Sequence, residues 1–208
     1  MGSEIYTIGY AGFPDIDEFI KVLKSYGITT LLDARSRPYL AYFEQYAEDN
    51  LRNALTKEDL AYIKFEDEFG LEPAGNLDDS DEMPDFELIA ETESFQNGIS
   101  RVRFGLEKGL VPVILGEAMD PMMCHRGLLI GRVLHDLGYK VMHIIPGGLK
   151  DHSELEREII EFARENTDNG NEVQEQLSLI PSDGETHAAV KNEDLLVEGY
   201  RLLNRMLY

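Results

Sequence analysis

The stretch from residue 110 to residue 137 constrains the fold most, because it has the pattern of one strand, one loop and one helix. Residues 111–115 form a short apolar run, which is typical of a buried strand. Residues 116–123 contain an Asp-Pro pair and predict a loop. From Gly127 onward apolar residues recur at helical spacing, and Gly138 predicts the helix end. This order of elements indicates an α/β protein.

The only cysteine of the chain, Cys124, stands where the predicted loop enters the helix, and His125 and Arg126 follow it directly. A helix N-terminus and a neighbouring cation both favour the thiolate, which is the nucleophilic and metal-binding form. The alternative is that Cys124 is a small buried residue that packs the loop under the sheet. Both interpretations follow from the sequence.

Four further β-rich runs occur along the chain, and helical patterns separate them. These runs are residues 5–8, 28–32, 61–65 and 139–145. Strands separated by helices predict an α/β fold, here a single domain with a mainly parallel sheet of about five strands flanked by helices. We expect the α/β domain to span residues 1–165. Residues 166–208 are expected to form a polar connection and a C-terminal helix that packs back on the same domain.

Four of the predicted strand ends lead into loops of distinctive composition. The loops begin at Gly9-Tyr10, at Asp33, at Glu117 and at Pro146. In open α/β sheets, ligands bind beyond the carboxyl ends of the strands. The sequence therefore predicts that these loops converge on one crevice.

Two arginines, Arg35 and Arg37, follow the predicted strand 28–32. Two guanidinium groups there can hold a phosphate or a carboxylate, or they can pair with the acidic surface of the protein itself. Asp33 is expected either to orient an arginine or to act in catalysis. We place Tyr10, from the first loop, in the same ligand-binding group.

Two residues beside Cys124 are candidates for proton transfer. Glu117 can act as a general acid or base if the crevice desolvates it, or it can pair with Arg126. His125 can act as an acid, a base or a ligand, or it can be a hydrogen-bonded neighbour of the helix start. His143 lies inside a predicted strand and is expected to be a packed core residue.

No metal site and no cofactor is predicted. Cysteine and histidine pairs at metal-binding spacing do not occur, and neither do glycine-rich nucleotide-binding motifs.

The chain has 40 acidic and 19 basic residues, a formal net charge of −21. Such a surface repels phosphate backbones and argues against a nucleic-acid partner. No apolar run approaches the roughly 18 residues of a membrane span, so no membrane association is expected. A single cysteine excludes an intramolecular disulfide framework and predicts a cytoplasmic location. The sequence predicts no oligomeric state.

Several motifs resemble the domain of unknown function 488 family. They are Thr7-Ile8-Gly9-Tyr10, Asp33-Ala34-Arg35-Ser36-Arg37-Pro38, the segment from Glu117 through Pro121 to Cys124-His125-Arg126, and the C-terminal residues 176–179 and 200–202. The resemblance implies a bacterial or archaeal α/β protein and no assigned activity. Two positions depart from the family pattern: the family usually has histidine where Tyr10 stands, and often cysteine where Leu115 stands. A two-cysteine redox cycle is therefore not expected.

The sequence leads to one hypothesis and two alternatives. The hypothesis is an enzyme with Cys124, His125 and Glu117 in catalysis, acting on a small substrate that carries a phosphate or carboxylate. The substrate-binding residues in this hypothesis are Tyr10, Asp33, Arg35, Arg37 and Arg126. The alternatives are a non-catalytic binding module for a small anionic ligand or nucleotide, and a nucleic-acid-associated protein.

Overall fold

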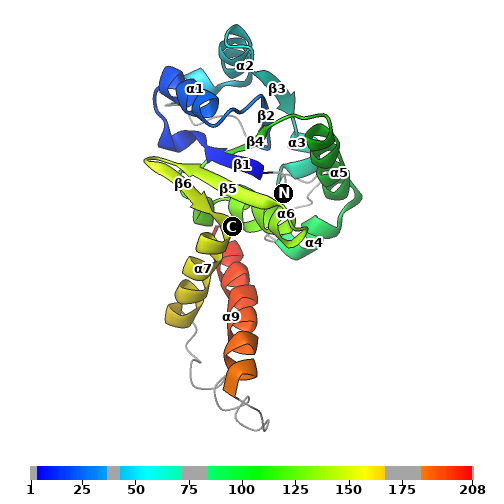
Figure 1. The fold of residues 1–208 in the computed structure, drawn as a ribbon, viewed down its shortest axis with the longest axis vertical. Coiled ribbons are helices and arrows are strands. Elements are labelled where there is room, and N and C mark those ends of the chain that lie inside the picture. The colour runs from blue at the N-terminus through cyan, green and yellow to red at the C-terminus, as the bar shows by residue number, and fades with distance from the viewer. Residues whose placement is uncertain (1–3, 37–42, 72–83, 167–183, 208) are drawn as a thin grey trace, which may run out of the picture. The chain divides into compact units, whose positions relative to one another are not determined.

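The computed structural model describes residues 4–36, 43–71, 84–166 and 184–207, with residues 184–191 described by their backbone only (Figure 1). The chain divides into two compact units, Met1–His152 and Ser153–Tyr208. Whether residues 166–208 pack back on the α/β domain stays a prediction.

The first unit contains a six-stranded sheet with the strand order β3-β2-β4-β1-β5-β6. Its strands are β1 (Glu4–Gly9), β2 (Thr30–Asp33), β3 (Ala61–Lys64), β4 (Pro112–Gly116), β5 (Lys140–Ile145) and β6 (Gly148–Asp151). Neighbouring strands from β3 to β5 are parallel, while β6 runs antiparallel to β5. The predicted α/β fold with a mainly parallel sheet is confirmed.

The prediction of about five strands omitted β6. Residues 146 and 147 do form a loop, but it is a tight turn, after which the chain returns along β5 as β6. Gly147 makes the reversal possible with a φ of 93°, which side chains disfavour. Residues 148–151 (GLKD) have little intrinsic strand preference, so it is the pairing with β5 that makes them a strand.

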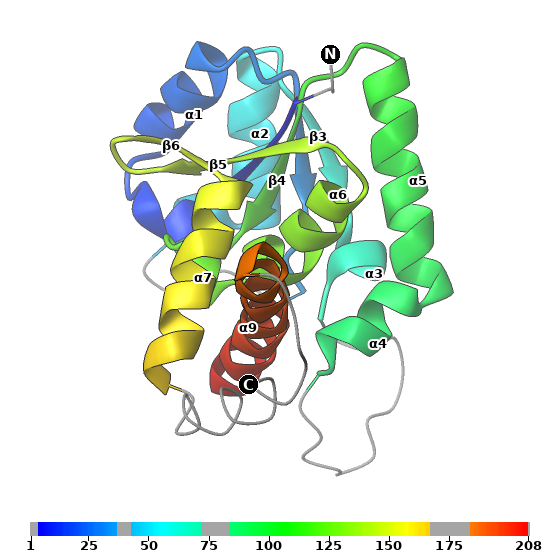
Figure 2. The ribbon, with the colours of Figure 1, turned by 60° about the horizontal axis from the view of Figure 1, so that its bottom comes forward.

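Helices cover both faces of this sheet (Figure 2). The helices of the first unit are α1 (Ile16–Ser25), α2 (Glu48–Lys57), α3 (Glu66–Phe69), α4 (Phe86–Glu91), α5 (Glu93–Glu107) and α6 (Arg132–Asp136). Short 3₁₀ helices lie at η1 (Tyr10–Gly12), η2 (Glu44–Tyr46) and η3 (Pro121–Met123), and η4 (Arg126–Gly131) is π-helical.

Helix α1 begins at an aspartate N-cap, Asp15. The Asp15 carboxylate accepts hydrogen bonds from the backbone N–H groups of Asp17 (2.7 Å) and Glu18 (3.1 Å). The buried side chains of α1 and α2 then pack on one face of the sheet, together with alternate residues of the central strands. This core contains Phe19, Ile20, Leu23, Leu51 and Leu55 from the helices, and Tyr6, Ile8, Leu31, Val113, Leu115 and Ile144 from the strands. Helices α5 and α6 lie on the opposite face.

The second unit contains α7 (His152–Asn166), which begins at the last residue of the first unit, and α9 (Gly184–Leu207). The two helices lie side by side because Gly199 has no side chain. A Cβ atom at Gly199 would lie 2.6 Å from Cγ2 of Ile159. A hydrogen bond of 2.7 Å from Arg164 to Asn192 joins the same helices. None of the helices in the described residues is long and apolar enough to span a bilayer.

Candidate functional site

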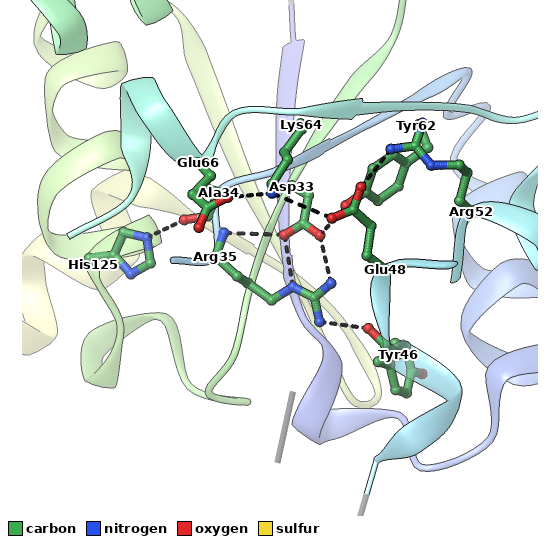
Figure 3. Close-up of polar contacts among 10 residues, drawn as sticks. All are labelled: Asp33, Ala34, Arg35, Tyr46, Glu48, Arg52, Tyr62, Lys64, Glu66 and His125. Carbon is green, nitrogen blue, oxygen red and sulfur yellow. Dashed lines mark hydrogen bonds and ion pairs between the residues drawn. The ribbon is translucent and has the colours of Figure 1, made fainter. Parts of the chain in front are cut away.

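The carboxyl ends of β2, β4 and β1 lie next to one another in the sheet. Asp33 pairs with Leu115, and Gly9 pairs with Gly116. The loops that follow these strands also contact one another. The backbone N–H of Ala11 donates to the carbonyl of Glu117 at 3.0 Å, and His125 Nε2 lies 3.1 Å from the carbonyl of Ala34 (Figure 3). The fourth loop lies against the first, because a Cβ atom at Gly12 would lie 3.1 Å from Cγ of Pro146. All four predicted loops are thereby brought together.

Cys124 lies between η3 and η4 and is 6% exposed. Its Sγ atom is 3.8 Å from His125 Nδ1. Its carbonyl accepts hydrogen bonds from the N–H groups of Gly127 (2.9 Å) and Leu128 (3.1 Å), where the chain enters the π-helical segment η4. The predicted helix start after Cys124 is therefore present, but its first turns are wider than those of an α-helix. Such π-helical turns are rare and occur frequently at functional sites.

Arg126 is fully buried. Its Nη1 donates to the carbonyl of Ala118 at 2.5 Å, and its Nη2 donates to the carbonyl of Met119 at 3.0 Å. Its Nε has no hydrogen-bond partner among the described residues. Arg126 thus contacts backbone carbonyls rather than Glu117, which is exposed on the same loop.

Two glycines leave the space that Arg126 and Cys124 occupy. A Cβ atom at Gly116 would lie 2.8 Å from Cys124 Sγ and 2.9 Å from Arg126 Cδ. A Cβ atom at Gly9 would lie only 1.8 Å from the carbonyl oxygen of Ala118. Gly116 was not among the predicted site residues. The sequence does contain a signal for Gly116, because β1 and β4, which are neighbours in the sheet, both end in glycine.

The surroundings of Cys124 change the acidity of its thiol. Burial raises the pKa of the thiol. The positive charges of Arg126 and His125, and hydrogen bonds from the His125 side chain and the Arg126 backbone, lower the pKa more strongly. The net result is a pKa well below the ordinary value of a cysteine.

A second network surrounds Asp33, which is 4% exposed (Figure 3). Arg35 donates to its carboxylate twice, from Nε to Oδ1 at 2.7 Å and from Nη2 to Oδ2 at 2.6 Å. The third donor of Arg35, Nη1, binds the carbonyl of Tyr46 at 3.0 Å. The hydroxyl of Tyr62, in β3, donates to Asp33 Oδ2 at 2.7 Å. Asp33 therefore orients Arg35, which is one of the two roles the sequence suggested for it.

Tyr10 belongs to the same network and is 1% exposed. The guanidinium of Arg35 lies 5.2 Å from the centre of the Tyr10 ring, and Tyr10 stacks on Tyr46 at a centroid distance of 5.1 Å. Arg37 lies outside the described residues. The ligand-binding roles of Tyr10, Asp33, Arg35 and Arg37 stay predictions.

Sequence reasoning missed the roles of Tyr46 and Tyr62. They lie 11 and 29 residues from their partners in the network, so no local pattern connects them.

A chain of buried polar side chains lies beneath η4. Thr7 Oγ1 is 2.7 Å from His143 Nδ1, and His143 Nε2 is 2.9 Å from His152 Nδ1. His143 is fully buried, as a core residue should be. Burial, followed by the charges of neighbouring groups, lowers the pKa of His143 well below its usual value and that of His152 to about 3. Within the described part of the chain, no cluster of three or more His, Cys, Asp or Glu side chains could hold a metal ion.

Comparison with known proteins gives one match. The family model described as domain of unknown function DUF488 matches residues 15–133, more than half of the chain. The matched range contains Asp33, Arg35 and the segment from Glu117 to Arg126. No curated protein and no solved structure matches the chain.

Proposed function

The chain belongs to the DUF488 family, whose description assigns no activity, and we propose that it is an enzyme in which the Cys124 thiolate is the nucleophile. The proposed substrate is small and carries a phosphate or a carboxylate group. His125 and Glu117 are the proposed proton-transfer residues.

The observation that carries this proposal is the buried guanidinium of Arg126. Removing an arginine from water costs several kcal/mol unless an anion balances its charge. Among the described residues, the hydrogen-bond partners of the Arg126 guanidinium are two backbone carbonyls, and no carboxylate pairs with it. The Cys124 sulfur and the Arg126 side chain both lie within 3 Å of the position that a Cβ atom would take on Gly116. A thiolate supplies the missing negative charge and is the reactive form of cysteine.

The hydrogen bond of His125 supports a role in proton transfer. A carbonyl oxygen only accepts hydrogen bonds, so the contact with Ala34 requires a proton on His125 Nε2. In the neutral ring the unprotonated nitrogen is then Nδ1, which faces Cys124 Sγ at 3.8 Å. In this tautomer His125 can accept the thiol proton, and as an imidazolium it stabilises the thiolate.

The burial of the site supports a small substrate. Because Cys124 is 6% exposed, a bulky group cannot reach the sulfur without movement of the surrounding loops. Of the predicted anion contacts, Arg35 and Arg126 lie in the described residues, and the guanidinium of Arg35 is already held by Asp33. An anionic substrate would have to compete with that carboxylate, or to bind through the positive charge of Arg126 and His125.

The test uses the fact that the protein has one cysteine. Thiolate absorbance and the rate of alkylation, measured against pH, report on Cys124 alone, and Cys124→Ser supplies the blank. We expect a titration midpoint below the free value of about 8.5. Arg126→Met should raise this midpoint, whereas Arg52→Met, which removes an exposed arginine of α2, should leave it unchanged.

A wild-type midpoint at or above the free value would contradict the proposal. So would a thiol that reacts only after unfolding. The anionic substrate is tested separately: inorganic phosphate or acetate, added at constant ionic strength, should slow alkylation of the native protein. If chloride slows it equally, the site has no preference for these anions.

A non-catalytic binding module is the second candidate function. The observation that favours it is the near-complete burial of Cys124 and Arg126, which suits a site that holds its groups in place. The two candidates are distinguished by incubating the protein with small phosphate- or carboxylate-bearing compounds that protect Cys124 from alkylation, and then analysing those compounds. An enzyme consumes such a compound, and a binding module releases it unchanged.

A further inference from the structure

A pocket of about 600 Å³ lies between α5 and the sheet, away from Cys124. Its floor is made by the first residues of two strands, Thr30 of β2 and Pro112 of β4, together with Leu32. Cys124, in contrast, follows the last residues of β4. The pocket therefore belongs to a different part of the sheet from the site proposed above.

The pocket exists because α5 covers this face of the sheet incompletely. The neighbouring residues Leu31 and Val113 point to the other face and lie in the core under α1 and α2. Residues on the α5 side meet a helix that presents small or polar groups at Ser100 and Gly105. The remaining volume has the size of a small-molecule site.

The lining is mostly apolar. Phe65 and Val102 are each 2% exposed, and they are joined by the partly exposed Ile63. At the rim, Phe104 is 60% exposed and Leu110 is 37% exposed. Exposed apolar side chains of this size beside a pocket are typical of a binding surface.

Two cations lie over aromatic rings that line the pocket. The guanidinium of Arg101, which also lines it, is 4.1 Å from the centre of the Phe65 ring. The ammonium of Lys108 is 5.1 Å from the centre of the Phe104 ring. Arg101 and Lys108 thus place two cationic side chains beside the pocket of a protein whose net charge is −21.

Arg101 is also paired with Glu68. The arginine side chain of this pair is 45% exposed and the Glu68 side chain is 16% exposed. Because the arginine is open to solvent, a ligand carboxylate can bind it beside Glu68 or in place of Glu68.

We propose that this pocket binds an amphipathic carboxylate, a small molecule with an apolar chain or ring and one acidic group. The apolar part lies against Leu32, Val102 and Phe104. The acidic group lies at the rim, near Arg101 and Lys108.

The experiment uses the full chain and three probes with the same ten-carbon chain, measured by calorimetry below their micelle concentrations: decanoate, decanol and decyltrimethylammonium. We expect decanoate to bind most tightly, decanol more weakly, and the cationic probe not at all. Equal binding of decanoate and decanol would contradict the acidic group of the proposed ligand. Binding of none of the three would contradict the site.

Variants of the rim test the cations. Arg101→Gln should weaken decanoate binding about fivefold, since an exposed charge contributes up to about 1 kcal/mol, and it should leave decanol binding unchanged. Arg101→Gln combined with Lys108→Gln should weaken decanoate binding more than tenfold. Arg103→Gln removes an exposed arginine of the same helix that does not line the pocket, and it should have no effect.

Variants of Gly105 test the pocket itself. A Cβ atom at Gly105 would meet only Cδ1 of Leu110, at an ordinary 3.4 Å, so a side chain can be added there without displacing the backbone. Gly105→Met should fill the pocket and weaken binding of both decanoate and decanol more than tenfold. Gly105→Ala adds helix preference without filling the volume and is the matched control. If Gly105→Met binds decanoate normally, the ligand lies elsewhere and the proposal is wrong.

A second copy of the chain is the competing occupant of this surface. Sedimentation at increasing protein concentration, with and without Phe104→Ser, tests it. A dimer that dissociates on this substitution would overturn the small-molecule proposal, and a monomer at all concentrations supports it.

Discussion

Two arginines, Arg35 after β2 and Arg126 in η4, are stabilised in different ways. The Arg35 side chain is 9% exposed, and Arg126 is fully buried. Arg35 has a carboxylate partner, Asp33, with two hydrogen bonds of 2.7 and 2.6 Å. The described partners of Arg126 are the carbonyls of Ala118 and Met119. One arginine therefore lies in a neutral pair, whereas the other keeps a positive charge beside a cysteine.

The difference shows which arginine can influence chemistry. The charge of Arg35 is balanced by Asp33, so this arginine contributes little to the surrounding electrostatic potential. Its main effect is to hold the loop after β2 in place. The charge of Arg126 is not balanced by a carboxylate. It lowers the pKa of Cys124 and also that of His143 on β5.

The largest expected effect comes from breaking the neutral pair. Asp33→Asn leaves the Arg35 guanidinium buried without a counter-charge and should lower the free energy of unfolding by about 3–5 kcal/mol. Urea-induced unfolding measures this. A loss of unfolding free energy below about 1 kcal/mol would mean that water already solvates the Arg35 guanidinium. Arg35 would then be able to bind an anionic ligand without competing strongly with Asp33.

The second prediction concerns the histidines beneath η4. His143 and His152 have folded-state pKa values below the usual value of about 6.5, for His152 about 3. Their contribution to stability is therefore complete above pH 6.5 and is lost as the pH falls from 6.5 toward the folded pKa. Each histidine should lower the free energy of unfolding by about 1.4 kcal/mol per pH unit in this range.

Urea unfolding at pH 7 and pH 5 tests this expectation, with His152→Gln as the comparison. The variant should lose less stability between pH 7 and pH 5 than the wild type, because it lacks the contribution of His152. The contribution of the carboxylates is the same in both proteins and cancels in the comparison. An identical loss in the two proteins would mean that His152 is already protonated or is exposed in solution.

A smaller effect is expected from Tyr62→Phe, which keeps the ring and removes the hydroxyl that donates to Asp33 at 2.7 Å. A hydrogen bond to a charged group is worth about 1.5–3 kcal/mol, and the partial exposure of Tyr62 places the expected loss at the lower end. The midpoint of urea unfolding should fall without a change in its slope. An unchanged midpoint would mean that the hydrogen bonds from Arg35 alone are enough to stabilise the buried Asp33 carboxylate.

The smallest effect is expected at Glu48, whose carboxylate pairs with Arg52 at 2.7 Å and with Lys64 at 3.4 Å, close to Asp33 in the structure (Figure 3). These side chains are 42–51% exposed, and exposed ion pairs contribute little. Glu48→Gln should give no measurable change in the unfolding midpoint at physiological salt. A loss comparable to that of Asp33→Asn would show that burial does not distinguish the two networks.

Much of the fold could be predicted from the sequence, because its signals are local. The apolar run 111–115 and the four other β-rich runs each overlap a strand of the sheet. The stripe of Phe19, Ile20 and Leu23 that begins after Asp15 is the buried face of α1. Strand β6 was missed because its preference for a strand comes from pairing with β5 and not from its own four residues.

The candidate site could be predicted only in outline. The rule that ligands bind at the carboxyl ends of parallel strands correctly brought the loops after β1, β2, β4 and β5 together. It could not say which groups would pair inside them. For Asp33 and Glu117 the sequence left two roles each, and for Arg35 a ligand or an internal ion pair.

The sequence by itself determined the α/β class, the order of the elements and the position of one cysteine directly before a helix, because periodicity and turn chemistry act over a few residues. Only the tertiary structure decided that Asp33 neutralises Arg35 and that carbonyls of its own loop hold Arg126. The tertiary structure also places Thr7 Oγ1 within 2.7 Å of Nδ1 of His143, a residue 136 positions away in the sequence. The physical reason is that burial and pairing depend on which distant segments exclude water from a charge, and no local pattern records those neighbours.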